Sequence, residues 1–175
     1  MEQMEKAGYR NLTVDQMVAM KIHGVTADFI SEVKSLGWSP TPDQLVAFRV
    51  HGVDAAAVKE MRDLGYSLTP DQAVAARVHG VNPAYANSWK QQGMKGLTFD
   101  KLVALKVHGA DPAQLGDLKA LGFGELSADD IVKIRVFELT PEFIRKARSY
   151  GFRDLRLEQI VQLKQLGILD SKESK

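Results

Sequence analysis

Apolar and polar positions recur along the chain every 28 or 29 residues. The pattern is clearest at residues 68–81, where a leucine is followed by Thr-Pro-Asp-Gln, an apolar segment and the tetrapeptide Val-His-Gly-Val. Phe137 and Leu166 occupy the histidine position in the last two copies, and the earlier copies hold His23, His51, His79 and His108. A fixed period in this range is typical of repeat proteins, in which each repeat buries its apolar face against its neighbours.

The pattern within each repeat predicts two helices joined by a tight turn. We therefore expect an all-α fold, an α-solenoid of tandem αα-hairpins, with a right-handed superhelix and a single repeat domain over residues 1–175. Residues 1–11 and 155–169 are expected to be partial repeats, with a tail at 170–175. The complete repeats are expected at residues 12–39, 40–67, 68–96, 97–125 and 126–154.

The start of the first helix of each repeat is marked by a capping residue. The N-caps are Thr13, Thr41, Thr69, Thr98 and Ser127. A glutamine three residues later completes a capping box in the first three repeats, whereas Lys101 and Asp130 are expected to break the box in the fourth and fifth. The position where this helix begins is thus predicted from local sequence alone.

A glycine after the histidine position is expected to end the first helix in the left-handed conformation. The second helix then begins almost at once, at the N-caps Thr26, Asp54, Asn82, Asp111 and Thr140. It is expected to run for about 11 residues to another glycine, the length of a three-turn helix. A large apolar residue follows that glycine and is expected to pack back on the hairpin; these residues are Trp38, Tyr66, Met94, Phe123 and Phe152.

The first helix is apolar over most of its circumference. It carries a valine five residues before the histidine position in every copy, and a second aliphatic residue just before that position at Ile22, Val50, Val78, Val107 and Val136. We therefore expect the first helices to be the inner, buried layer and the more amphipathic second helices to be the outer layer. The loosest packing is expected in the second helices of the third and fourth repeats, the latter weakened by Gly116.

Composition limits the classes of function. The chain has 45% hydrophobic and 26% charged residues, as folded domains do, and its net charge of +1 argues against a domain that binds nucleic acid by charge alone. It has no cysteine, which excludes disulfides and thiol chemistry. No export signal or long apolar run is present, which leaves the compartment open and slightly favours the cytoplasm.

The four histidines are the first candidates for chemistry, because imidazole is a common metal ligand and acid-base group. They occupy one position in successive repeats, and stacked helices lie about 8–10 Å apart, whereas zinc needs its nitrogen ligands about 2 Å away. We favour a structural role, in which each imidazole meets the last carbonyls of its own helix. Catalytic, cofactor and metal sites are therefore not predicted, and we expect no enzyme activity.

A row of basic residues lies two positions before the histidine position. Such a row could track a phosphate backbone, or each cation could complement the negative end of its own helix dipole, which is the interpretation we favour. The second helices carry a similar row at Lys34, Arg62, Lys90, Lys119 and Arg148. The candidate anion-binding row is Lys21, Arg49, Arg77, Lys106, Arg135 and Lys164.

A third pattern places glutamine, alanine and histidine on one face of the first helix, at spacings of three and four residues. Polar residues beside a small one could form a shallow groove for an extended peptide, or the alanines could allow close helix packing; both interpretations stay open. The candidate interaction surface is Gln16, His23, Gln44, His51, Gln72, His79 and His108.

The repeated Leu-Thr-x-Asp-Gln, His-Gly-Val and Leu-Gly-Tyr elements resemble the helical repeats attached to some bacterial antirepressor-type zinc metallopeptidases and related signalling proteins. That resemblance implies a sensor or interaction segment. Residues 68–75 together with His79-Gly80 are also similar to the first helix and base-reading pair of TAL-effector DNA-binding repeats. This second resemblance implies that the His-Gly pairs at residues 23–24, 51–52, 79–80 and 108–109 contact bases.

The function we expect is a non-catalytic scaffold or protein-interaction module, part of a larger bacterial signalling or regulatory protein, with a protein or peptide as partner. DNA binding through the His-Gly turns and the basic row is the alternative. End-to-end self-association through residues 1–9 and 168–175 is a further possibility. No membrane contact is expected from this segment.

Overall fold

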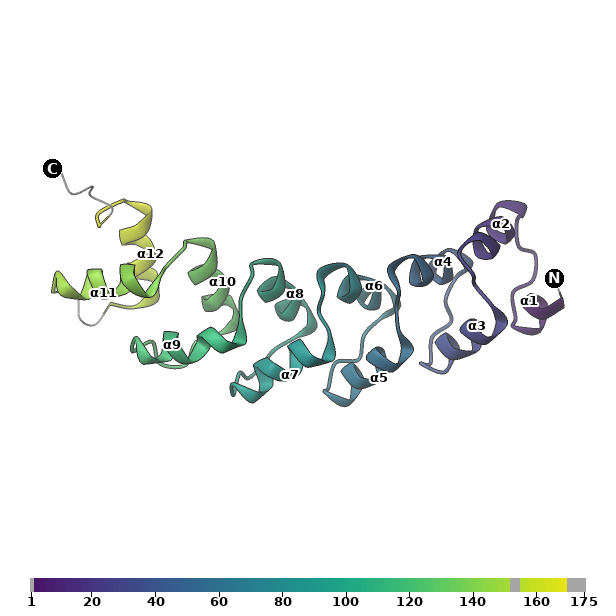
Figure 1. Ribbon diagram of the computed structural model, residues 1–175, viewed down its shortest axis with the longest axis horizontal. Helices are drawn as coiled ribbons and strands as arrows, with labels where there is room; N and C mark the ends of the chain where they lie inside the picture. The colour runs from purple at the N-terminus through teal and green to yellow at the C-terminus, as the bar shows by residue number, and fades with distance from the viewer. Residues whose placement is uncertain (1, 152–154, 170–175) are drawn as a thin grey trace. The chain divides into compact units, whose positions relative to one another are not determined.

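The computed structural model describes residues 2–151 and 155–169, and in these residues it is all-helical, without β-strands. The predicted all-α class is therefore confirmed for the described part of the chain (Figure 1). None of the described helices is long and apolar enough to cross a membrane. Phe152 and the tail after Leu169 lie outside the described residues.

The chain forms two compact units, which we call the N-terminal unit (residues 1–86) and the C-terminal unit (residues 87–175). The boundary falls within α7 (Pro83–Gln91). The N-terminal unit contains α1 (Glu2–Lys6), α2 (Val14–Ile22), α3 (Ala27–Lys34), α4 (Pro42–His51), α5 (Ala55–Asp63) and α6 (Pro70–His79). The C-terminal unit contains α8 (Phe99–Val107), the 3-10 helix η1 (Pro112–Gln114), α9 (Leu115–Ala120), α10 (Ala128–Val136), α11 (Pro141–Ser149) and α12 (Leu157–Gln165).

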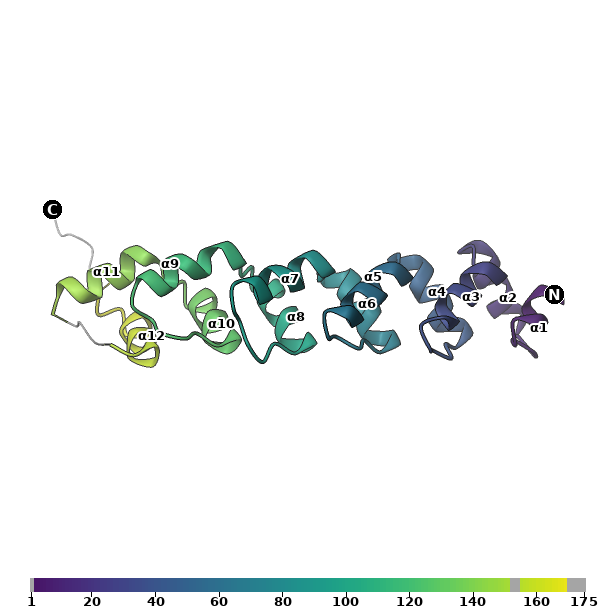
Figure 2. The same cartoon turned by 90° about the horizontal axis from the view of Figure 1, so that it is seen from below.

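Within each unit the helices form two layers. In the N-terminal unit α4 packs against both α2 and α6, while α3 and α5 form the other layer (Figure 1). In the C-terminal unit α10 packs against α8 and α12, and α9 and α11 lie in the other layer (Figure 2). The first helix of each hairpin therefore meets first helices of neighbouring hairpins in the same unit.

The predicted helix starts are confirmed. Thr13 accepts a hydrogen bond from the backbone N–H of Gln16 at 3.1 Å, and the Gln16 side chain accepts one from the N–H of Thr13 at 3.2 Å. The same capping box forms at the starts of α4 and α6. The expectation that Asp130 breaks the box is wrong, because its Oδ2 accepts from the Ser127 N–H at 3.0 Å. An aspartate at this position is long enough to reach back to the N-cap.

The predicted helix ends are also confirmed, with one exception in residue type. Gly24, Gly52, Gly80 and Gly109 all have φ between 65° and 69°, the left-handed conformation. The residue after each glycine donates to a carbonyl five positions earlier, as Val53 does to Phe48 at 2.8 Å. Glu138 occupies the glycine position of the fifth hairpin and adopts the same conformation, with φ 50°.

Each unit has its own hydrophobic core, built from both helical layers. In the N-terminal unit Ile30 of α3 and Leu45 and Phe48 of α4 are fully buried. In the C-terminal unit Ile144 of α11 and Ile160 of α12 are buried in the corresponding cluster. The second helices thus bury one face against the first helices, as their amphipathic pattern predicts.

The expectation that the first helix is buried around most of its circumference is wrong. The aliphatic residue before the histidine position is between 50% and 72% exposed in all five copies, which are Ile22, Val50, Val78, Val107 and Val136. The helix buries only the face that carries residues three and six positions before the histidine, such as Phe48 and Leu45. The opposite face is open to solvent.

The second helices are shorter than the predicted 11 residues. The complete ones contain eight or nine residues, and the fourth hairpin has a three-residue 3-10 turn followed by the six-residue α9. α9 contains Gly116, the glycine that was expected to weaken the second helix of the fourth repeat. The Trp38 ring contacts the next hairpin, since its centroid lies 5.7 Å from that of Phe48.

Candidate functional site: the exposed face of the first helices

The basic row of the first helices contacts the preceding hairpin. Arg49 Nε donates to the carbonyl oxygen of His23 at 3.4 Å. Arg77 makes the same contact with His51 at 3.4 Å, and Arg135 makes it with His108 at 3.3 Å. Each carbonyl belongs to the end of a helix, where the last carbonyls lack intrahelical donors and carry partial negative charge. The arginines therefore complement the dipole of the helix before their own.

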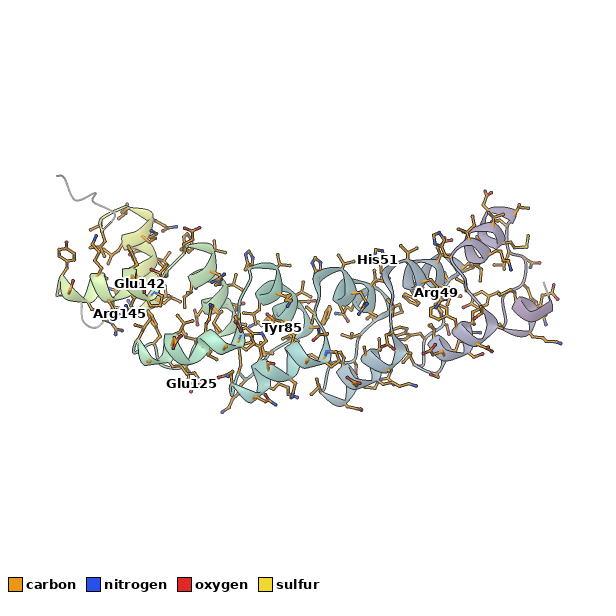
Figure 3. All side chains as sticks on the ribbon, in the orientation of Figure 1. Arg49, His51, Tyr85, Glu125, Glu142 and Arg145 are labelled. Atoms are coloured by element: carbon orange, nitrogen blue, oxygen red, sulfur yellow. The ribbon has the colours of Figure 1, made fainter. Side chains whose placement is uncertain are left out.

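Arg49 and Lys164 of this row also lie over aromatic rings. The Arg49 guanidinium carbon is 4.8 Å from the centroid of Phe29, in the second helix of the preceding hairpin. Lys164 Nζ is 5.0 Å from the centroid of Phe143 in the equivalent arrangement. Both distances are within the range of a cation–π interaction. Arg49 is labelled in Figure 3.

The basic residues of the second helices follow the same rule. Arg62 Nη2 donates to the carbonyl of Leu36 at 2.6 Å, and Lys119 Nζ donates to that of Gln92 at 3.4 Å. Both acceptors lie near the end of the preceding second helix. The two rows of positive charge thus join consecutive hairpins, a role that sequence reasoning missed because it requires the register between hairpins.

The arginines and the lysines of the candidate anion-binding row therefore have different surroundings. Arg49, Arg77 and Arg135 are exposed but already hydrogen-bonded to main-chain carbonyls, which directs their charge toward the protein. Lys21 lines a cavity of about 440 Å³ between α1 and α2. Lys106 is exposed, and Lys164 is half-buried over Phe143.

All four histidines are exposed. His51 and His79 are the last residues of α4 and α6, and His23 and His108 are the C-caps of α2 and α8. Among the described residues no imidazole makes a hydrogen bond, so the expectation that each imidazole meets its own helix carbonyls is wrong. At His23, His51 and His108 the arginine of the next hairpin donates to the carbonyl instead. The described residues also contain no cluster of three possible metal ligands.

The glutamines of the candidate interaction surface are partly buried, and their side chains already make hydrogen bonds within the protein. The Oε1 atoms of Gln16, Gln44 and Gln72 accept the N-cap N–H of their own helices. Gln44 also donates from Nε2 to Asp71 Oδ1 of the next hairpin, at 3.3 Å. These glutamines therefore serve helix starts and hairpin contacts, whereas the histidines remain available at the surface, as His51 does (Figure 3).

The exposed aliphatic residues complete this face, and sequence reasoning placed them in the core. We call the set Ile22, Val50 and Val78 of the N-terminal unit the aliphatic ridge; Val107 and Val136 occupy the same positions in the C-terminal unit. At 100° per residue, the position one before the histidine lies about 200° around the helix from the buried position three before the histidine. Its place opposite the buried face, beside a basic residue, was the signal in the sequence that the ridge faces solvent.

The partly buried valines five positions before the histidine flank the ridge, about 40° away around the helix. In the N-terminal unit these are Val46 and Val74, with Val18 half exposed. Because α4 contacts both α2 and α6, the ridge runs across three neighbouring helices with a histidine beside each step. Chemically, this surface can bury apolar groups and offer imidazole nitrogens.

Comparison with models of known protein families finds no match, and comparison with curated protein sequences finds no significant similarity.

Proposed function

We propose that the chain is an α-solenoid of tandem αα-hairpins that acts as a non-catalytic protein-interaction or scaffold module. The solenoid is supported by hairpins that recur every 28 or 29 residues and by the arginine contacts, which join residues 26 or 27 positions apart. The resemblance to repeats of bacterial signalling proteins supports a place for the module in such a protein. The docking surface in this proposal is the exposed face of the first helices.

The aliphatic ridge is the observation that carries the proposal. Single exposed valines are common on protein surfaces, but here an aliphatic residue is at least half exposed at the same position of three contacting helices. Exposed apolar residues gathered on one face, with polar neighbours, are typical of protein-binding surfaces. The exposed ridge lowers solubility and does not stabilise the fold. A partner that covers the ridge would bury these side chains and gain binding energy from doing so.

The spacing of the ridge suggests the form of the partner. Packed helices lie about 8–10 Å apart, so the three ridge residues are separated by steps of that size. A peptide in the polyproline II conformation advances about 3.1 Å per residue and repeats after three residues, about 9.3 Å. We expect an extended segment with an apolar side chain at every third position, contacting Ile22, Val50 and Val78 in turn.

Selection from a random peptide library displayed on phage, followed by measurement of each selected peptide, tests the proposal. Peptides selected on the wild-type protein should bind V50Q/V78Q roughly tenfold more weakly, because two partly exposed valines each contribute about 0.5–1 kcal/mol of apolar burial. Glutamine keeps helix propensity at these positions. Lys59→Gln on the exposed face of α5 is the matched control and should leave binding unchanged.

The opposite results would reject the proposal. If every selected peptide binds V50Q/V78Q as it binds the wild type, the ridge is not the docking surface. If the protein instead binds random duplex DNA at low salt, with an affinity that falls steeply as salt rises, the nucleic-acid function implied by the TAL-effector resemblance takes its place.

A further inference from the structure

Two cavities occupy equivalent places in the two units, each beneath an arginine of the basic row. One, of about 70 Å³, is lined by Ala57 and Arg77 in the N-terminal unit. The other, of about 450 Å³, is lined by Gln114 and Arg135 in the C-terminal unit. Ala57 and Gln114 hold the second-helix position that is Phe29 in the first hairpin and Phe143 in the fifth.

Neither cavity has an aromatic ring at this position. Where the ring is present, it lies directly beneath the cation of the next hairpin, as Phe29 lies 4.8 Å from Arg49. Arg77 and Arg135 keep the same hydrogen bond to the preceding carbonyl, at 3.4 and 3.3 Å, so the guanidinium is held in place without its ring. Each arginine is thus positioned over a site without an aromatic ring, lined by Ala57 below Arg77 and by Gln114 below Arg135.

Of these two cavities, the one beneath Arg135 is large enough for a ligand. Sites for small molecules occupy about 300–1,000 Å³, and even a benzene-sized cavity is about 150 Å³. The cavity of about 70 Å³ beneath Arg77 is too small for either. The larger one has an apolar floor that includes Leu118, Ile134 and Leu139, all buried.

The rim of the larger cavity is acidic. Asp111, Asp117 and Glu138 line it, against the single cation Arg135, and all are exposed. Asp111 uses one carboxylate oxygen to accept the N–H of Ala113 at 2.9 Å. The apolar floor and the guanidinium above it favour an aromatic ring in the ligand. The excess of carboxylates at the rim favours a positive charge.

We propose that this cavity binds a small aromatic primary amine, with its ring beneath Arg135 in the place of Phe29 and Phe143. Its ammonium group is directed toward Asp117 and Glu138. This site is separate from the aliphatic ridge, and the inference does not depend on the proposed function.

Phenethylamine is the probe, and the readout is the set of backbone amide NMR shifts of residues 108–118 and 131–141. We expect saturable shifts in these two segments at ligand concentrations up to about 10 mM, the range in which a weak fragment-sized ligand binds. Phenethyl alcohol keeps the ring without the charge, and hexylamine keeps the charge without the ring. Each should bind at least about fivefold more weakly, since each lacks one of the two contacts.

Three variants test the geometry. Gln114→Phe restores the ring found in other hairpins, so it should abolish phenethylamine binding while raising the thermal midpoint of unfolding. Ala57→Phe makes the same change at the other cavity and should leave binding unchanged. D117N/E138Q keeps the shape of the site and should weaken phenethylamine about fivefold to tenfold with little effect on phenethyl alcohol.

The proposal is overturned if phenethylamine causes no saturable shift in these segments, or if Gln114→Phe, still folded by its NMR spectrum, binds it as before. Equal affinities for the amine and the alcohol would refute the role of the carboxylates. A doubly blocked Phe-Lys dipeptide carries the same ring and ammonium group on a peptide. If it binds more tightly than phenethylamine, the site belongs to a protein side-chain pair and the small-molecule assignment is wrong.

Discussion

Replacing Arg49 with methionine should destabilise the protein more than the same replacement at Arg77. Both arginines donate to a carbonyl of the preceding first helix at 3.4 Å, but only Arg49 has a ring beneath it, that of Phe29 at 4.8 Å. Ala57 stands in the ring position below Arg77. Methionine keeps the length of the side chain and its helix propensity, so the comparison isolates the guanidinium group.

The expected magnitudes follow from these contacts. A long, exposed hydrogen bond contributes about 0.5 kcal/mol, the low end of the usual range. An exposed cation–π contact contributes about 0.5–1 kcal/mol. Arg49→Met should therefore lower the free energy of unfolding by about 1–1.5 kcal/mol and Arg77→Met by about 0.5 kcal/mol. For a chain of this size, the thermal midpoints should fall by about 3–5 °C and about 1–2 °C.

Urea unfolding followed by circular dichroism measures the two differences, and a double-mutant cycle separates the ring contact from everything else. Phe29→Leu combined with Arg49→Met should show a coupling of about 0.5–1 kcal/mol, whereas Phe29→Leu combined with Arg77→Met should be additive. Equal losses at the two arginines, with additive cycles at both, would refute the ring contact. Unchanged stability in both variants would show that the basic row does not join the hairpins.

Three further predictions concern single positions. Glu138→Gly should raise the free energy of unfolding, measured in urea, by about 0.5–1 kcal/mol, because relief of the left-handed strain at Glu138 exceeds the entropy cost of glycine. The control Gly109→Ala, at φ 66°, should lower the free energy of unfolding, and a less stable Glu138→Gly variant would contradict this account. Leu45→Ala should cost about 2–5 kcal/mol and Val50→Ala less than about 1 kcal/mol in the same assay, and similar costs would mean that Val50 is not at the surface. The pKa of Glu142 is lowered by a hydrogen bond from its own backbone N–H, by the Thr140 hydroxyl and by Arg145, so its small stabilising effect should be present above the ordinary glutamate pKa and be lost as pH falls through the lowered value; an NMR titration of the Glu142 carboxyl that shows an unshifted or raised pKa would contradict this.

Features that depend only on nearby residues could be predicted from the sequence. The N-cap at Thr13 and the left-handed glycine at Gly24 each require residues a few positions apart, and both are found as expected. The capping box at Asp130 is also local. The prediction missed it because it took the aspartate side chain to be too short to reach the Ser127 N–H, although the position of the cap was right. Helix starts and stops are therefore encoded almost entirely within each repeat.

Features that depend on the next hairpin could not be predicted in the same way. Val50 is apolar and recurs, which suggested burial; its angle from Phe48 and the basic residue beside it point to solvent only once the neighbouring helix is known to cover the Phe48 face. Arg49 was assigned to the dipole of its own helix, because its actual acceptor, the His23 carbonyl, is 26 residues away. The candidate site was found only in part for this reason: its histidines were identified, but its aliphatic residues were placed in the core.

The backward direction of the arginine contacts has a consequence for how the protein forms during synthesis. The C-terminal carbonyls of three first helices, those of His23, His51 and His108, accept from an arginine about one repeat later in the chain, at residues 49, 77 and 135. A ribosome makes the acceptor first, at about 5–20 residues per second, so each helix end waits on the order of seconds for its donor. The newest hairpin on a growing chain is thus always the least protected one, and proteolysis of stalled nascent chains should trim them back by about one repeat.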